Sequence, residues 1–195
     1  MKRVGLFGGS FDPVHNAHVA LARTALEQLR LDELRWIPVG QPWQKARRLA
    51  AAADREAMVR LAIAGEPRFV LDRVELRRSG ATFTLDTVRE LVAAEPGHRW
   101  FLILGQDQYA SLHTWHDWRE LLDLVTLAIA NRPGAALAVN PQIARAEHQV
   151  VPLPMMDVSS TEVRRRVAAG ESIADLVPDT VARYIEQHRL YSAAG

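Results

Sequence analysis

The sequence contains no cysteine, and this absence excludes two kinds of site. Neither a disulfide framework nor a thiolate-bound metal centre can form without cysteine. Long apolar runs are missing as well, since nowhere do the roughly 18 consecutive apolar residues of a membrane-spanning helix occur. The first apolar stretch breaks at Gly8-Gly9, which is too early for the core of a signal peptide. We therefore expect a soluble, cytoplasmic protein.

The sequence also lacks an excess of positive or negative charge. The 24 basic residues nearly balance 23 acidic ones, and the formal net charge is +1. Such a chain has no surplus of positive charge with which to displace counterions from DNA or RNA, so we expect no nucleic-acid partner. Lysine occurs only at Lys2 and Lys45, which makes Lys45 a position of interest. A length of 195 residues fits one domain, and we predict a single domain over residues 1–195, with the C-terminal helices of residues 159–195 as part of it.

Apolar runs typical of buried strands alternate along the chain with segments of helical periodicity. The predicted strands are residues 3–7, 34–39, 73–76, 100–104, 125–130 and 149–153. The predicted helices are residues 17–29, 54–64 with Met58, Leu61 and Ala62 facing inward, 85–94, a region with Trp115 and Trp118, 160–169 and 179–188. Nearly continuous apolar strands are typical of a parallel sheet that is covered on both faces. Strands that alternate with helices predict an open α/β sheet.

A candidate anion site follows the first predicted strand, where ligands collect in open α/β sheets. The segment reads Gly8-Gly9-Ser10-Phe11-Asp12-Pro13-Val14-His15-Asn16-Ala17-His18. Paired glycines expose backbone N–H groups and let a phosphate approach closely. His15 and His18 are three residues apart, so they share a face at the start of a helix, whose end adds partial positive charge. The pattern predicts a phosphate cradle, although it is neither a Walker A loop nor a GxGxxG fingerprint.

Zinc binding is the alternative use of the same histidines. His15 and His18 could form a zinc pair, with His113 or His116 supplying a further ligand. A zinc site needs at least three protein ligands and groups that orient them, and no HExxH-type pattern supports one here. Phosphate binding requires fewer assumptions.

A second candidate anion site lies near the C-terminus, in Ser159-Ser160-Thr161-Glu162-Val163-Arg164. Ser159 followed by Glu162 is a capping-box pattern that starts a helix. The free N–H groups of its first turn, the Ser160 and Thr161 hydroxyls and the Arg164 guanidinium could bind a polyphosphate. The simpler interpretation is a helix cap followed by an exposed arginine.

The two segments together carry a resemblance to a known family. GGSFDPVHNAH and SSTEVRR resemble the nucleotidyltransferase signatures (G)GxFDPxHxGH and ISSTxxR, in the same order. Ala17 stands where the family usually has glycine, and Val158 replaces its isoleucine. Neither change removes a functional side chain.

Within this family the chain is similar, almost end to end, to the bacterial nicotinate-nucleotide adenylyltransferases. The matching segments are residues 37–45 (IPxxxPPHK), 82–87 (SYTxDT), 104–118 (IGxDxxxxxxxW), 132–134 (RPG) and the ending 176–191. One departure affects the phosphate loop, because Trp43 and Gln44 replace the proline and histidine before Lys45. The cation of Lys45 itself is kept.

The resemblance implies a Rossmann-like α/β fold, with helices on both faces of a parallel sheet and a small C-terminal helical portion. It also implies a single nucleotidyltransferase domain that transfers AMP from ATP to nicotinate mononucleotide and releases pyrophosphate, a step of NAD biosynthesis. No covalent intermediate and no general base are needed, because the acceptor phosphate is already a nucleophile. The cofactor is Mg²⁺ held by the ATP phosphates, with no metal ligand from the protein.

The resemblance also implies a role for each matching residue. The implied catalytic residues are His15, His18, Lys45 and Arg164. The implied ATP-binding residues are Gly8, Gly9, Ser10, Phe11, His15, His18, Ser159, Ser160, Thr161 and Arg164. The implied acceptor-binding residues are Lys45, Thr84, Asp107, Trp115 and Arg132. Trp115 could equally be a plain core aromatic residue.

Four alternatives stay open at the level of sequence. The acceptor could be nicotinamide mononucleotide, or the enzyme could accept both pyridines. Pantetheine phosphate is a weaker candidate, because enzymes that use it lack segments like 82–87 and 104–118. A zinc-dependent phosphohydrolase built on the histidines is the candidate from another class. Oligomeric state is not encoded in these patterns.

Overall fold

The computed structural model describes the chain except for residues 41–48, 132–140, 144–145, 154–155 and 193–195. Its described strands form one sheet in the order β3-β2-β1-β4-β5-β6, and every neighbouring pair is parallel. The strands are β1 (Arg3–Gly9), β2 (Glu33–Pro38), β3 (Phe69–Leu71), β4 (Arg99–Gly105), β5 (Thr126–Asn131) and β6 (His148–Pro152). This is the strand order of a doubly wound, Rossmann-like sheet, which confirms the predicted fold class.

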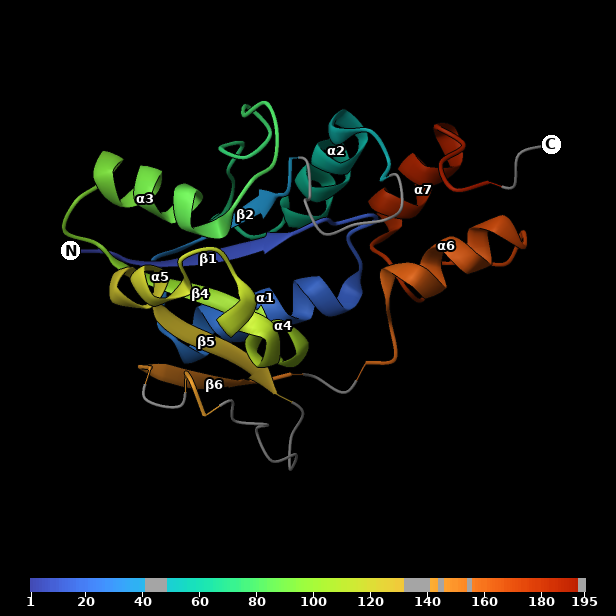
Figure 1. Ribbon diagram of the computed structural model, residues 1–195. Helices are drawn as coiled ribbons and strands as arrows, with labels where there is room; N and C mark the ends of the chain where they lie inside the picture. The colour runs from blue at the N-terminus through green and yellow to red at the C-terminus, as the bar shows by residue number, and fades with distance from the viewer. Residues whose placement is uncertain (41–48, 132–140, 144–145, 154–155, 193–195) are drawn as a thin grey trace.

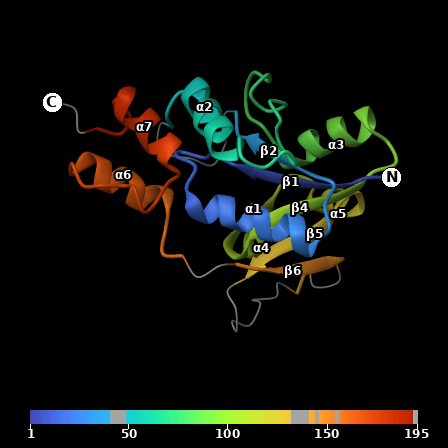
Figure 2. The same cartoon turned by 180° about the vertical axis from the view of Figure 1, so that it is seen from behind.

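Helices cover both faces of the sheet. They are α1 (Asn16–Gln28), α2 (Ala52–Ile63), α3 (Thr84–Ala94), α4 (Gln106–Ser111), the 3₁₀ helix η1 (Leu112–Thr114), α5 (Trp118–Leu124), α6 (Ser160–Ala168) and α7 (Asp179–Gln187). In Figure 1, α4 and α5 lie in front of the sheet, and in Figure 2 the opposite face shows α1 and α2. Helices α6 and α7 lie beyond the carboxyl ends of the strands in both views.

Two apolar cores result from this layering, because successive strand residues point to opposite faces. In β4, Phe101 and Ile103 enter the core under α1 and α2, whereas Leu102 and Leu104 enter the core under α3, α4 and α5. The first core also contains Val163 of α6 and Val181 of α7. The C-terminal helices therefore share a core with the sheet.

The structure differs from the sequence prediction at residues 73–76, where we expected a strand and the third strand is instead Phe69–Leu71. The Asp72 carboxylate accepts a hydrogen bond from the Val74 N–H at 2.9 Å, and the Arg77 N–H bonds to the Arg73 carbonyl at 3.1 Å. Such local bonds turn the chain and prevent it from continuing as a strand.

Leu61 was also expected to face inward, and this expectation was wrong. Leu61 is 36% exposed, while the buried residues of α2 are Arg55, Met58, Val59 and Ile63. The inward stripe of α2 therefore carries an arginine. No described helix combines the length and the apolarity that a membrane crossing requires.

Candidate active site at the carboxyl edge of the sheet

A cavity of about 480 Å³ opens at the carboxyl ends of β1 and β4. These strands are neighbours in the sheet, and the strand order reverses between them, which is where ligands bind in open α/β sheets. Of the predicted site residues, the lining contains Gly8, Gly9, Ser10, His18, Thr84 and Trp115. Six of the predicted residues therefore lie around one cavity, and their roles stay predictions.

Phe11 packs in the core beneath the loop that follows β1. Its ring is 1% exposed, and a Cβ atom on Gly9 would lie 3.0 Å from it, so a larger residue at position 9 would have to displace the ring. Phe11 itself has a φ of 45°, a left-handed conformation that costs a non-glycine residue roughly 1 kcal/mol. Edge contacts with Phe7 and His18 hold the ring in place. Phe11 therefore supports the loop from the core.

The two histidines lie at the start of α1, with His15 as its N-cap and His18 three residues on. Their rings stack with centroids 3.6 Å apart, and the His15 backbone N–H donates to His18 Nδ1 at 3.1 Å. Because Nδ1 accepts, a neutral His18 carries its proton on Nε2. His18 lines the cavity, whereas His15 is buried behind it.

Burial also determines the charge of this histidine pair. Desolvation lowers the pKa of His15 to about 4, and desolvation together with the neighbouring His15 lowers the pKa of His18 well below its ordinary value. Both imidazoles are therefore neutral at neutral pH in the ligand-free protein. His18 then faces the cavity as a neutral hydrogen-bond donor rather than as a cation.

The second predicted motif packs against the first one. Ser159 caps α6 by accepting the Glu162 N–H at 3.2 Å. The Ser160 hydroxyl donates to the Pro13 carbonyl at 2.9 Å, and Arg164 Nη1 donates to the Asp12 carbonyl at 2.7 Å. These bonds hold the start of α6 against the loop after β1, although Ser159, Ser160, Thr161 and Arg164 do not line the cavity itself.

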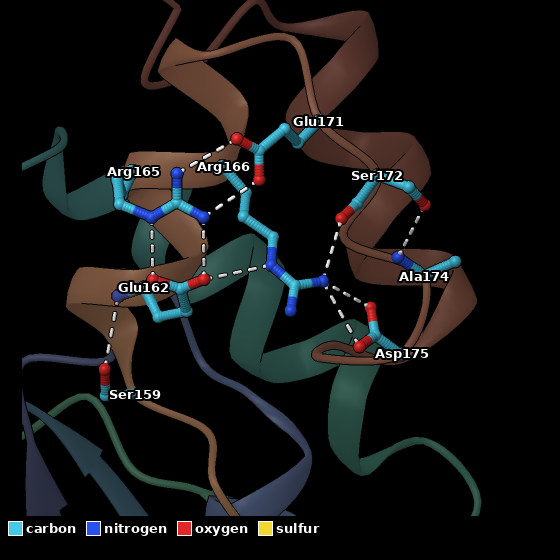
Figure 3. Close-up of polar contacts among 8 residues, drawn as sticks. All are labelled: Ser159, Glu162, Arg165, Arg166, Glu171, Ser172, Ala174 and Asp175. Carbon is cyan, nitrogen blue, oxygen red and sulfur yellow. Dashed lines mark hydrogen bonds and ion pairs between the residues drawn. The ribbon is translucent and has the colours of Figure 1, made fainter.

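Glu162 completes only half of the predicted capping box. Figure 3 shows its carboxylate between Arg165 and Arg166, and these arginines continue to Glu171 and Asp175 beyond the helix. Hydrogen bonds from Arg165 and Arg166 hold the pKa of Glu162 at about 2. The arginines have replaced the N-cap backbone as partners of this side chain.

Asp12 connects the loop to more distant parts of the chain. Its side chain is fully buried, and its Oδ1 accepts the Ala50 N–H at 3.2 Å and the Tyr191 hydroxyl at 2.7 Å. Since Arg164 binds its carbonyl, Asp12 holds three segments that are far apart in sequence. No role for Asp12 was predicted from the sequence.

The opposite wall of the cavity is the start of α3. Thr84 and Leu85 begin this helix and line the cavity, and the N-cap residue Phe83 makes no side-chain capping hydrogen bond. The N–H groups of an uncapped first turn are available to an anion. Trp115 and His116 complete this wall, so Trp115 is more than a core residue although it also packs on the second core.

Asp107 lies outside the cavity lining, as an exposed residue of α4. Its neighbour Gln108 lines the cavity instead, and Gln108 Oε1 accepts the Gly105 N–H at 3.1 Å. Lys45 and Arg132, like Trp43 and Gln44, fall outside the described residues, so their predicted roles have no structural counterpart here.

Two buried ionic residues near the cavity were not foreseen. Glu75 lines the cavity, is 8% exposed and accepts the Thr87 hydroxyl at 3.0 Å; burial raises its pKa. Arg55 is 2% exposed and donates to main-chain carbonyls only a few residues from the cavity. An arginine on the apolar stripe of a predicted helix was the signal available in the sequence.

The histidines do not gather into a metal site. Across the described part of the chain, no three His, Asp or Glu side chains come close enough to hold a metal ion. The zinc-phosphohydrolase alternative therefore has no support from the described geometry.

Comparison with known proteins agrees with this geometry. Residues 6–166 match the cytidylyltransferase-like family model. Nicotinate-nucleotide adenylyltransferases from Methylibium petroleiphilum and Bordetella petrii are 50% and 49% identical, over 98% of this chain and 93% and 100% of theirs.

Solved structures share the fold at low sequence identity. A Plasmodium falciparum nicotinic acid mononucleotide adenylyltransferase complexed with NaAD superposes with a TM-score of 0.82 at 20% identity, covering 98% of both chains. Because the family model spans most of the chain and the relatives align over nearly all of it, the chain belongs to the cytidylyltransferase-like family and, within it, to the nicotinate-nucleotide adenylyltransferases.

Proposed function

We propose that this protein transfers AMP from ATP to nicotinate mononucleotide, forming nicotinate adenine dinucleotide and pyrophosphate. One observation carries the proposal: the cavity at the switch point of the sheet is lined by the glycine-rich loop after β1 on one side and by the start of α3 on the other. The first is suited to ATP and the second to the acceptor. The names of the relatives point to the same reaction.

The reaction requires position and charge compensation rather than a base. An oxygen of the acceptor phosphate attacks the α-phosphorus of ATP, a new P–O bond forms, and the bond to the bridging oxygen breaks so that pyrophosphate leaves. The acceptor phosphate is ionised at neutral pH, so no proton needs to be removed first. Catalysis then depends on orienting two anions and stabilising the charge that develops.

We assign the ATP side of the cavity to the loop after β1 and the start of α6. Backbone N–H groups of Gly8, Gly9 and Ser10 face the phosphates, and His18 donates from Nε2. A bound polyphosphate would raise the pKa of His18, because a nearby negative charge favours the protonated form. His15 orients His18 through the stacked ring and the bond to Nδ1.

The start of α6 packs against the loop after β1 and assists ATP binding from there. Ser160 and Arg164 hydrogen-bond to Pro13 and Asp12, and we propose that both also contact ATP, with Ser159 and Thr161 forming the helix start. Lys45 supplies a further cation. Mg²⁺ accompanies ATP, held by phosphate oxygens, and offsets their charge when bound.

We assign the acceptor to the wall formed by α3 and Trp115. The pyridine ring stacks on Trp115, its carboxylate binds the first N–H groups of α3 near Thr84, and Arg132 and Asp107 contribute polar contacts to the acceptor. An amide in place of the carboxylate would leave one or two of these donors unpaired, at about 1–3 kcal/mol each. That difference corresponds to a preference of roughly 10- to 10³-fold.

The test is a side-by-side assay of both pyridine mononucleotides with saturating ATP and Mg²⁺. We expect kcat/KM for nicotinate mononucleotide to exceed that for nicotinamide mononucleotide by at least about tenfold. Equal values would mean a dual-specific enzyme, and free phosphate instead of pyrophosphate would contradict adenylyl transfer altogether.

The proposal also includes the domain organisation and the location of the protein. We propose one nucleotidyltransferase domain over residues 1–195, which is supported by the core that α6 and α7 share with β1 and β4. Location in the cytoplasm stays a prediction.

A further inference from the structure

Within the described residues, Arg55 donates its hydrogen bonds to main-chain carbonyls around the cavity. Its Nε binds the Ala50 carbonyl at 3.1 Å, and Nη1 binds the carbonyls of Ser10 at 3.0 Å and Val39 at 2.8 Å. Nη2 binds the Gly40 carbonyl at 3.3 Å. One buried guanidinium thus joins the loops after β1 and β2 to the start of α2.

The Val39–Gly40 peptide is held from its other side as well. While its carbonyl accepts from Arg55, its N–H, which belongs to Gly40, is directed at the Glu75 carboxylate and lowers the pKa that burial raises. The main chains of Gly40 and Glu75 are also packed tightly, because a Cβ atom on Gly40 would lie 2.4 Å from the main-chain carbonyl oxygen of Glu75. A cation therefore faces the negative pole of this peptide, and a carboxylate faces its positive pole.

Glu75 is itself fixed from α3. The Thr87 hydroxyl donates to Glu75 Oε1 at 3.0 Å, and Arg78 donates to the same hydroxyl oxygen at 2.9 Å, which leaves the Thr87 proton directed at Glu75. The resulting chain of hydrogen bonds starts on α2, crosses the carboxyl end of β2 and ends on α3. It links the helices on the two faces of the sheet through the edge of the cavity.

We propose that Arg55 and Glu75 are positioning residues that clamp the Val39–Gly40 peptide from opposite faces of the sheet and thereby set the geometry of the cavity for both substrates. The inference rests on the proposed function, since the geometry in question is that of nucleotide transfer. Neither residue needs to touch substrate to act in this way. Buried hydrogen bonds to a charged partner fix a peptide more firmly than neutral ones.

Arg55→Lys is the first test, because lysine keeps the charge but cannot reproduce the planar fork that binds several carbonyls. Arg35→Lys is the matched control. Arg35 is also buried, at 8% exposed, but its hydrogen bonds go to the carboxylates of Glu33 at 2.7 Å and of Glu95 rather than to the loops at the cavity. We expect both variants to lose stability in urea unfolding. Only Arg55→Lys should lower kcat/KM, by about tenfold or more, with a fall in kcat.

Glu75→Gln keeps the proposal testable if Arg55→Lys does not fold. Glutamine removes the negative charge that faces the peptide and replaces one carboxylate oxygen with an NH₂ donor, so kcat should fall in a folded protein. The double variant should lose less activity than the product of the two single losses, because both residues act on one peptide. Losses that multiply, or wild-type kcat/KM in folded Arg55→Lys and Glu75→Gln, would overturn the clamp.

Calorimetric titration with ATP and Mg²⁺ separates this inference from the proposed function. If the wild type binds ATP but forms no dinucleotide with either pyridine, the proposed function fails and the clamp does not. The clamp then requires weaker ATP binding in Arg55→Lys and unchanged binding in Arg35→Lys. Equal ATP affinity in all three proteins overturns it.

Discussion

The buried histidine pair predicts a loss of stability in mild acid. His15 has a pKa of about 4 in the folded protein against an ordinary value of 6.5, because its ring is desolvated. Between these values the unfolded chain binds a proton that the folded protein does not. Stability contributed by neutral His15 is therefore complete above about pH 6.5 and is lost as the pH falls toward 4.

The size of the effect follows from the two pKa values. A pKa difference of one corresponds to about 1.4 kcal/mol, and at about pH 5 the unfolded state is almost fully protonated while the folded state is not. His15 alone then costs roughly 2 kcal/mol of unfolding free energy relative to neutral pH. His18, whose pKa is lowered in the same direction, adds to this loss.

Urea unfolding of the wild type and of His15→Asn at about pH 7 and pH 5 measures this term. Asparagine does not titrate, so the wild type should lose about 2 kcal/mol more than the variant on acidification. Groups distant from His15 that titrate in this range affect both proteins and cancel in the comparison, whereas His18 loses the neighbouring His15, which helps to lower its pKa, so its own acid loss is smaller in the variant. Between about pH 7 and pH 8 the two proteins should change nearly equally. Equal losses between pH 7 and pH 5 would refute the claim that His15 is buried in its neutral form.

Two substitutions test the proposed roles in the ATP site. His18→Ala should lower kcat by roughly 10²–10³, the order lost when one preorganised donor is removed, in a protein that still folds; near-normal steady-state turnover would remove His18 from the mechanism. Arg164→Ala should weaken ATP binding by about 1.5–3 kcal/mol in calorimetry and leave the mononucleotide almost unaffected. Its neighbour Arg165, which Figure 3 shows bound to Glu162 and Glu171, provides the control Arg165→Ala with unchanged ATP affinity. A weakened acceptor with intact ATP binding would mean that the two sites were assigned in reverse.

Features that depend on local pattern were predicted correctly. The strand that ends in Gly8-Gly9, the helix start at Ser159 and the alternation of strands and helices all appear in the structure. Each rests on hydrophobic periodicity or on a cap, which are properties of neighbouring residues. The two motifs were expected in one site, and the hydrogen bond between Ser160 and Pro13 brings them together.

Features that depend on contacts between distant main-chain atoms were missed. Arg55 binds main-chain carbonyls that lie 45, 16 and 15 residues away. Every residue has such a carbonyl, so the sequence does not show which ones an arginine will bind. Glu75 was hidden for a related reason, because the turn that follows Asp72 was interpreted as a strand. Turn chemistry set by one carboxylate outweighed the alternation of apolar and charged residues there.

The bond between Tyr191 and Asp12 has a consequence for biosynthesis. It spans 179 residues, and the bonds of Arg164 and Ser160 to the same loop span 152 and 147. A ribosome therefore translates the loop after β1 long before these three partners. The nascent polypeptide carries an incompletely anchored loop until residue 191 has left the exit tunnel, because contacts of such long sequence separation form late.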